Sequence, residues 1–198
     1  MQEPRYSAPD PRRYIQNISM RMNVAMHRES ANNRDADKKM AAVCGLYCEA
    51  CSWFISTTED PERLKRLATQ RNWSVEESMC YGCRSEKRLP YCGQCKMSIC
   101  AEKRGIDFCT ECETFPCDDL KRFQSAMPHR IELWRNLERI KSVGYQQWLK
   151  EIRKYYACSR CQTINSAYDI RCRECGEEPS CHYVANHRQE IEPFLKNR

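Results

Sequence analysis

Pairs of cysteines two residues apart recur along this chain of 198 residues. Two thiolates at this spacing can bind one metal ion from a single tight turn. With 16 cysteines, the chain has ligands for several metal centres. The pairs are Cys48/Cys51, Cys80/Cys83, Cys92/Cys95, Cys109/Cys112, Cys158/Cys161 and Cys172/Cys175, and Cys44 adds a C-x3-C spacing with Cys48.

Disulfide bonds are the alternative use of an even number of cysteines. They would require a secreted protein, but the N-terminal sequence MQEPRYSAPDPRRYIQ has no apolar segment and no signal-peptide cleavage pattern. Metal ligation in a reducing compartment is therefore the favoured interpretation, and we expect a cytoplasmic protein.

The supply of large apolar side chains is small. Leu, Ile, Val and Phe together make up 30 of 198 residues, a share below the roughly 20% at which burial begins to offset the entropy lost on folding. Metal ions are expected to supply the missing stability. This composition excludes a large barrel or doubly wound enzyme, and no apolar run approaches the roughly 18 residues of a membrane span.

The clearest metal-binding pattern is C-x2-C-x10-C-x2-C, formed by Cys158, Cys161, Cys172 and Cys175. It is typical of a zinc ribbon, in which four thiolates surround one Zn²⁺ ion. Asn165-Ser166 could turn a hairpin between the two pairs. We expect closed tetrahedral coordination here, with no open position for a substrate.

Eleven further cysteines lie between residues 44 and 117 and predict at least two more metal sites. Cys80 and Cys83 are expected to pair with members of the Cys44–Cys51 group. The two C-x2-C-x4-C stretches are expected to share ligands with each other. Extra ligands could come from Cys181, His182 and His187. The eleven are Cys44, Cys48, Cys51, Cys80, Cys83, Cys92, Cys95, Cys100, Cys109, Cys112 and Cys117.

The metal need not be zinc at every site, because iron–sulfur clusters use the same thiolates. Cys44-x3-Cys48-x2-Cys51 has the spacing that holds a [4Fe-4S] cluster in radical-SAM enzymes. However, Ala50 stands where those enzymes have an aromatic residue, and no glycine-rich segment follows. The chain also has no phosphate-binding loop, zinc-protease motif or nucleophile elbow, so we expect a protein that is not an enzyme.

The fold expected from these patterns is a small, metal-stabilised α+β protein: a Cys-rich zinc-knuckle domain with helices, then a helical hairpin and a C-terminal zinc ribbon. Asp60-Pro61 and Ser74-x-x-Glu77 predict two helix starts. The expected boundaries are an N-terminal extension with an amphipathic helix (1–40), the Cys-rich domain with its hairpin (41–157), the ribbon (158–180) and a helical tail (181–198).

The predicted helical hairpin carries an excess of basic residues. Residues 121–157 contain nine basic and three acidic side chains. Apolar stripes on the two helices, such as Leu133/Leu137/Ile140 and Trp148/Leu149/Ile152, leave basic residues on the opposite faces. Such a surface beside a ribbon favours contact with the phosphates of structured RNA. The candidate contacts are Arg135, Arg139, Lys150, Arg153 and Lys154.

Residues 43–155 resemble an uncharacterised family known as domain of unknown function thirty-seven ninety-five. The resemblance rests on Cys44-Gly-Leu-Tyr-Cys-Glu-Ala-Cys51, Cys80-Tyr-Gly-Cys83-Arg, Cys92-x2-Cys95-x4-Cys100, Cys109-x2-Cys112 with Phe115-Pro116-Cys117, and the Gly144 and Trp148-Leu149 region. It implies a compact metal-binding domain, often with an appended ribbon, and no established activity.

Three functions follow from these observations. The first is a zinc-binding, non-enzymatic adaptor that associates with RNA or with a ribonucleoprotein such as the ribosome. The second is an Fe–S protein of redox chemistry or cofactor delivery, with a [4Fe-4S] cluster at Cys44, Cys48 and Cys51. The third is a protein–protein scaffold subunit that uses a helix near residues 11–28 as its partner contact.

Overall fold

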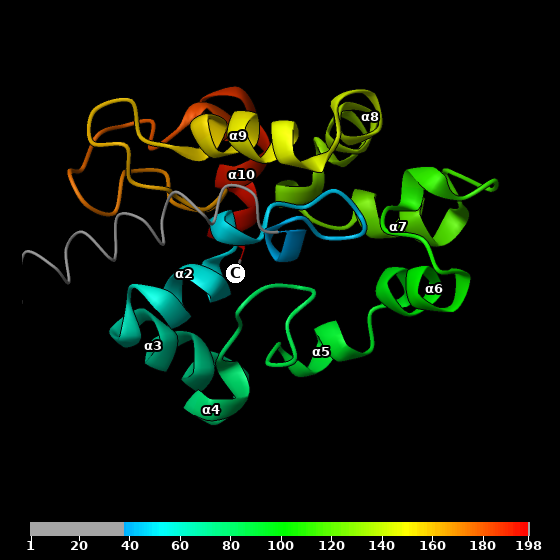
Figure 1. Ribbon diagram of the computed structural model, residues 1–198. Coiled ribbons are helices and arrows are strands. Elements are labelled where there is room, and N and C mark those ends of the chain that lie inside the picture. The colour runs from blue at the N-terminus through cyan, green and yellow to red at the C-terminus, as the bar shows by residue number, and fades with distance from the viewer. Residues whose placement is uncertain (1–37, 198) are drawn as a thin grey trace, which may run out of the picture. The chain divides into compact units, whose positions relative to one another are not determined.

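Helices form nearly all the regular structure of residues 38–197, the part of the chain that the computed structural model describes (Figure 1). The helix expected near residues 11–28 lies outside this part. The α-helices are α2 (Ser52–Thr58), α3 (Pro61–Arg71), α4 (Val75–Ser78), α5 (Pro90–Gly93), α6 (Lys96–Arg104), α7 (Asp118–Ser125), α8 (Leu133–Val143), α9 (Tyr145–Tyr156) and α10 (His182–Lys196). Short 3-10 helices are η1 (Lys38–Met40), η2 (Cys48–Ala50), η3 (Cys109–Glu111) and η4 (Pro128–Arg130).

The β component of the predicted α+β class is not confirmed. Residues 38–197 contain two isolated β-bridges, Ala41 with Tyr47 and Ala157 with Ile164, and no β-strand. The paired strands of a zinc ribbon are therefore absent from the segment between α9 and α10. What the structure shows is a small, mostly helical protein rich in cysteine.

Local signals set the helix ends where the sequence predicts them. The Asp60 side chain accepts a hydrogen bond from the backbone N–H of Arg63 and caps α3, whose first residue is Pro61. Ser74 and Glu77 form a reciprocal capping box at α4. Gly144, with φ of 80°, separates α8 from α9. The two helices therefore fold back as the predicted hairpin.

The main core joins this hairpin to the rest of the body. Leu137 on α8 and Trp148 on α9 are at most 1% exposed, and the indole N–H of Trp148 donates to Asn136 Oδ1 at 3.4 Å. Helix α10 adds Tyr183, which stacks on Tyr156 with ring centroids 5.0 Å apart. Figure 1 shows α8, α9 and α10 together on one side of the body. The C-terminal helix is thus part of the core.

A smaller core lies among α2, α3 and the segment that leads into α5. It consists of Trp53, Leu64, Cys80 and Leu89, all buried. This second core is too small to hold four short helices by apolar contact alone. Cysteines at its edges, described below, connect it to the main core.

The turn at Gly45 is a point of close contact between the first cysteine segment and α8. Gly45 has φ of +82°, and a Cβ there would lie 2.8 Å from Leu137 Cγ and 3.3 Å from the carbonyl oxygen of Leu133. A side chain at this position is disfavoured both by the backbone conformation and by the packing.

Gly45→Ala should therefore lower the free energy of unfolding by about 1–3 kcal/mol in urea denaturation. Gly93→Ala is the matched control, because nothing lies within 4 Å of its Cβ position. It should change stability little. Equal effects of the two substitutions would contradict this account of the turn.

Candidate metal centres

Four thiols of the segment between α9 and α10 converge on one point. The Sγ atoms of Cys158, Cys161, Cys172 and Cys175 all lie within 4.8 Å of one another. Cys158 Sγ is 3.6 Å from Cys175 Sγ, and Cys161 Sγ is 3.5 Å from Cys172 Sγ. A tetrahedral Zn²⁺ with Zn–S bonds of about 2.3 Å places its sulfurs about 3.8 Å apart. The four thiols fit a single metal ion.

The structure contains no disulfide bond among the cysteines. All 16 cysteines lie in the described part of the chain, and all are free. The thiol pairs at 3.5 and 3.6 Å are far beyond the roughly 2.05 Å of an S–S bond. The C-x2-C pairs are therefore available as ligands.

Two equivalent turns present these thiols. In the first, the N–H of Gln162 donates to the carbonyl of Cys158 at 3.0 Å, and Gln162 has φ of 63°. In the second, the N–H of Gly176 donates to the carbonyl of Cys172 at 3.0 Å, with φ of 74°. Each turn ends in the left-handed region, which lets the chain curl around an ion. The sequence predicts the glycine turn, but Gln162 gives no such signal.

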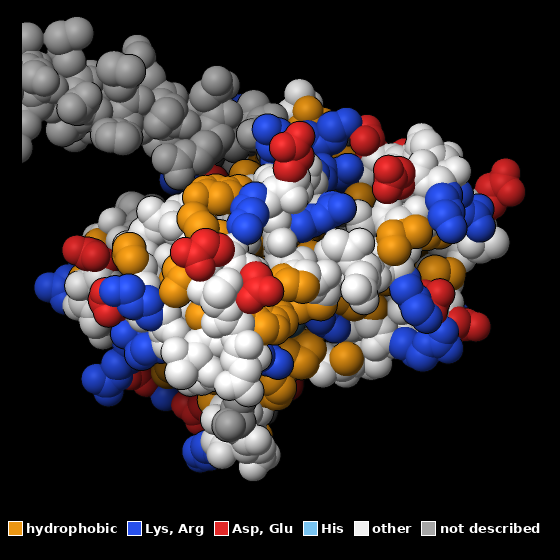
Figure 2. Space-filling view, turned by 90° about the horizontal axis from the view of Figure 1, so that it is seen from below, with side chains coloured by type: hydrophobic (Ala, Val, Ile, Leu, Met, Phe, Trp, Pro, Cys, Tyr) orange, Lys and Arg blue, Asp and Glu red, His pale blue; other side chains and the backbone are white. Residues whose placement is uncertain are grey.

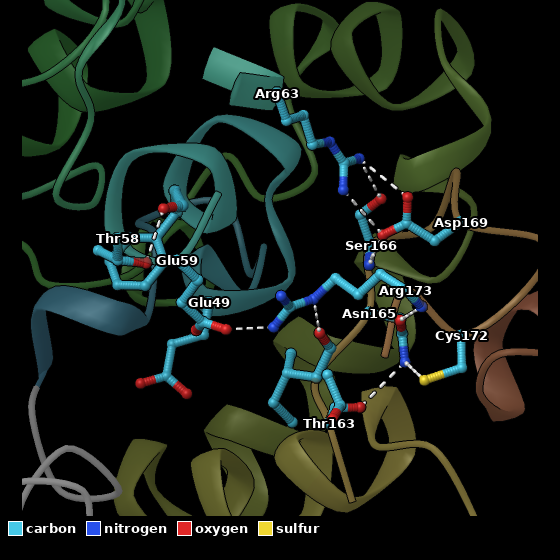
Figure 3. Close-up of polar contacts among 12 residues, drawn as sticks. Glu49, Thr58, Glu59, Arg63, Thr163, Asn165, Ser166, Asp169, Cys172 and Arg173 are labelled. Atoms are coloured by element: carbon cyan, nitrogen blue, oxygen red, sulfur yellow. Dashed lines mark hydrogen bonds and ion pairs between the residues drawn. The ribbon is translucent and has the colours of Figure 1, made fainter. Parts of the chain in front are cut away.

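The turn expected at Asn165-Ser166 lies slightly later in the chain, where the N–H of Asp169 donates to the carbonyl of Ser166 at 3.1 Å; Asn165 and Ser166 themselves are buried, at 0% and 1% exposure. The Asn165 amide lies beside the four thiols instead. Its Nδ2 donates to the carbonyl of Thr163 at 2.9 Å and lies 3.6 Å from Cys172 Sγ. Its Oδ1 accepts from the backbone N–H of Arg173 at 3.0 Å (Figure 3). Asn165 therefore orients a ligand rather than turning the chain.

Two arginines fasten the four-cysteine segment to the helices α2 and α3. Arg63 on α3 forms a two-point ion pair with Asp169, with N–O distances of 2.9 and 3.2 Å, and contacts Ser166 (Figure 3). The Arg63 and Asp169 side chains are only 16% and 12% exposed. Arg173 donates to the carbonyl of Ile164 and pairs with Glu59 at the end of α2. Sequence patterns gave no sign of these links, because their partners are about 100 residues apart.

The environment of Cys161 favours the form that binds metal. Two hydrogen bonds lower the pKa of Cys161 to about 6. The one with the Thr163 hydroxyl has the larger effect, and the one with the Thr163 backbone N–H the smaller. A thiol with this pKa is largely ionised at neutral pH, and the thiolate is the ligand.

A second group of cysteines lies between the two cores. The backbone N–H of Cys83 donates to Cys48 Sγ at 3.3 Å. The pKa of Cys51 is raised to about 12, mainly by burial and to a smaller extent by the charge of Cys80. The pKa of Cys92 is also raised, mainly by a hydrogen bond with Cys83 and to a smaller extent by burial. The structure therefore places Cys80 and Cys83 beside Cys48 and Cys51, and adds Cys92 to them.

A third group lines a cavity of about 50 Å³ between α6, η3 and α7: Cys100, Cys109, Cys112 and Cys117. The pKa of Cys109 is raised to about 12, mainly by burial and to a smaller extent by the charges of Cys117 and Cys100. Cys100 therefore joins the first C-x2-C-x4-C stretch (Cys92, Cys95 and Cys100) to the second (Cys109, Cys112 and Cys117) at this cavity.

Cys44 and Cys95 lie near both of these groups, and the other candidate ligands lie elsewhere. Cys44 is buried in the main core, which Cys95 contacts from its edge; burial has the largest effect in raising the pKa of Cys44, and the charges of Cys83, Cys109 and Cys95 add to it. Cys181 is buried beside Ser180, His182 stacks on Tyr155, and His187 Nε2 lies 2.8 Å from Glu132 Oε1. Within residues 38–197, three or more ligand atoms come within 4.8 Å of one another only at the Cys158 centre.

Acidic partners hold several of the basic residues proposed to contact RNA. Arg139 forms two hydrogen bonds to Glu151, at 2.6 and 2.7 Å. Arg153 donates to Glu49 Oε2 at 2.6 Å. Arg135 contacts Glu132 at 3.2 Å and stacks over the Tyr155 ring, although its side chain stays 67% exposed. Lys150 and Lys154 on α9 are exposed. The basic surface is therefore smaller than the sequence predicts.

Residues 40–122 match the model of a family described as protein of unknown function (DUF3795). The match confirms the resemblance seen in the sequence, and it contains all eleven cysteines from Cys44 to Cys117. Helices α8 and α9 and the Cys158 centre lie beyond it. No curated protein and no solved structure matches the chain. In residues 38–197, none of the helices is long and apolar enough to cross a membrane.

Asn165→Ala tests whether the amide supports the Cys158 centre. The substitution removes the N–H beside Cys172 and leaves the N–H of Arg173 without its acceptor. We expect a loss of about 10- to 100-fold in metal affinity, measured by competition with a chromogenic chelator. Asn186→Ala, on the exposed face of α10, should leave the affinity unchanged. The account of Asn165 fails if the two variants bind metal equally well.

Proposed function

We propose that this protein is a non-enzymatic adaptor in which zinc, bound at the Cys158 centre, has a structural role. The observation that supports this most strongly is the convergence of four thiols on one point. Four protein ligands complete a tetrahedral shell, so no position remains for a substrate or a reactive water. An all-thiolate set also selects zinc or iron over harder cations.

The position of the centre explains why an ion is needed. The segment from Ala157 to Cys181 joins α9 to α10 and contains no helix or strand. Besides the core contacts of Ile164 and Ala167, the segment is held by the two cysteine turns, the Asn165 amide and the ion pairs of Arg63 and Arg173. A bound ion links both turns directly, and the ion pairs then fix the segment against α2 and α3.

Loss of this ion should loosen the segment first. A structural zinc is worth on the order of 10 kcal/mol of folding free energy. We expect the double substitution Cys158→Ser and Cys172→Ser to remove one zinc ion per chain and to abolish amide-exchange protection in residues 157–181. Cys181→Ala, at a buried cysteine outside the centre, is the control and should keep both. Retained protection in the zinc-free double variant would contradict the proposal.

RNA is the partner that we propose for this adaptor. Support comes from Lys150 and Lys154, which are exposed on α9. By contrast, Lys and Arg side chains are mixed with Asp and Glu over the face shown in Figure 2. Cations without acidic neighbours contact phosphates best, because binding then releases counterions without breaking an ion pair.

The test reverses the two lysine charges. Lys150→Glu with Lys154→Glu should reduce the affinity for structured RNA at least tenfold at low salt, and wild-type affinity should fall steeply as salt rises. Lys65→Glu with Arg66→Glu makes the same charge change on the exposed face of α3 and should have little effect. If wild type binds no RNA at low salt, the protein–protein scaffold becomes the better proposal.

A further inference from the structure

The cavity between α6, η3 and α7 differs from the Cys158 centre although both are lined by four cysteines. Its thiols come from three segments: Cys100 from α6, Cys109 and Cys112 from the η3 turn, and Cys117 from the residue before α7. The rest of the wall is mostly apolar, with Met97, Ala101, Ile106, Phe115 and Leu120. The four thiols thus line a partly open cavity of about 50 Å³.

The spacing of these thiols indicates what could fill the volume. At the Cys158 centre all four sulfurs lie within 4.8 Å, as one tetrahedral ion requires. Nowhere else in residues 38–197 do three ligand atoms come that close. As placed, the cavity thiols do not form the tetrahedron of a single ion. A [4Fe-4S] cluster needs its four thiolates more widely spread, because each binds a different corner of the cube.

The polar neighbours of the cavity suit a negatively charged cluster. Arg104 at the end of α6 lines a surface hollow together with Cys100, and the Cys100 thiolate raises the pKa of this guanidinium. Lys96 and Asp119 also line the cavity and form an ion pair at 3.5 Å. The Thr114 hydroxyl lies 3.2 Å from Cys112 Sγ. Four thiolates give such a cluster a net negative charge, which Arg104 offsets. Hydrogen bonds to the ligand sulfurs are also a means by which proteins set a cluster's reduction potential.

We propose that Cys100, Cys109, Cys112 and Cys117 hold a [4Fe-4S] cluster. This site differs from the Cys44/Cys48/Cys51 group that sequence spacing indicates for such a cluster. It also stands independently of the zinc proposal, since it shares no ligand with the Cys158 centre. Cys100 and Cys117 are exposed, so the cluster would lie at the protein surface.

The test uses the full chain purified without oxygen and reconstituted with ferrous iron and sulfide. Wild type should gain a broad absorbance near 400 nm. Cys112→Ser with Cys117→Ser should lose about four iron and four sulfide ions per chain relative to wild type. Cys158→Ser with Cys172→Ser should lose zinc and keep this iron, which separates failure here from failure of the zinc proposal. Full iron retention by the cavity variant would overturn the assignment, and so would a wild type that takes up zinc but no iron.

A milder substitution guards against a variant that does not fold. Arg104→Gln removes a positive charge beside Cys100 but no ligand. The reconstituted variant should keep its iron, and its reduction potential should become more negative than that of wild type. Lys65→Gln, on α3, is the control and should leave the potential unchanged. An unchanged potential in Arg104→Gln would place the cluster elsewhere.

Discussion

The convergence of four thiols at the Cys158 centre is the interaction on which the chain after α9 depends. Between α9 and α10 the chain has no regular element and adds only a few side chains, such as Ile164 and Ala167, to the main core. Cysteine turns, the buried Asn165 amide and two arginine ion pairs hold the rest of the segment. Since α10 contributes Tyr183 and Ile191 to the main core, order in the centre also secures the end of the chain.

The sequence predicted well those features that depend on neighbouring residues. The caps at Asp60 and Ser74, the hairpin at Gly144 and the four ligands at residues 158–175 all follow from local spacing or chemistry. The strands predicted for the zinc ribbon are not found, because local spacing alone does not determine whether two segments pair. Cysteine turns and short extended segments look alike in sequence whether or not strands pair. Between α9 and α10, one β-bridge forms, between Ala157 and Ile164.

Features that depend on distant parts of the chain could not be predicted. The basic stripe on α8 and α9 looked continuous because Glu49, 104 residues before Arg153, gave no local signal. The role of Asn165 was likewise hidden, since its partners are arranged only when both cysteine turns fold. The cavity beside α6 needs three separate segments, so spacing alone could not separate its ligands from those around Cys48.

The measurement that tests the central claim most directly is anomalous X-ray diffraction from crystals of the protein, collected on both sides of the zinc absorption edge. The account predicts one zinc peak among Cys158, Cys161, Cys172 and Cys175, with four Zn–S distances of about 2.3 Å and tetrahedral angles. A zinc ion bound there by fewer than four thiolates, with water in the remaining position, would contradict a closed structural centre. A disulfide between any two of these cysteines would contradict metal binding there altogether.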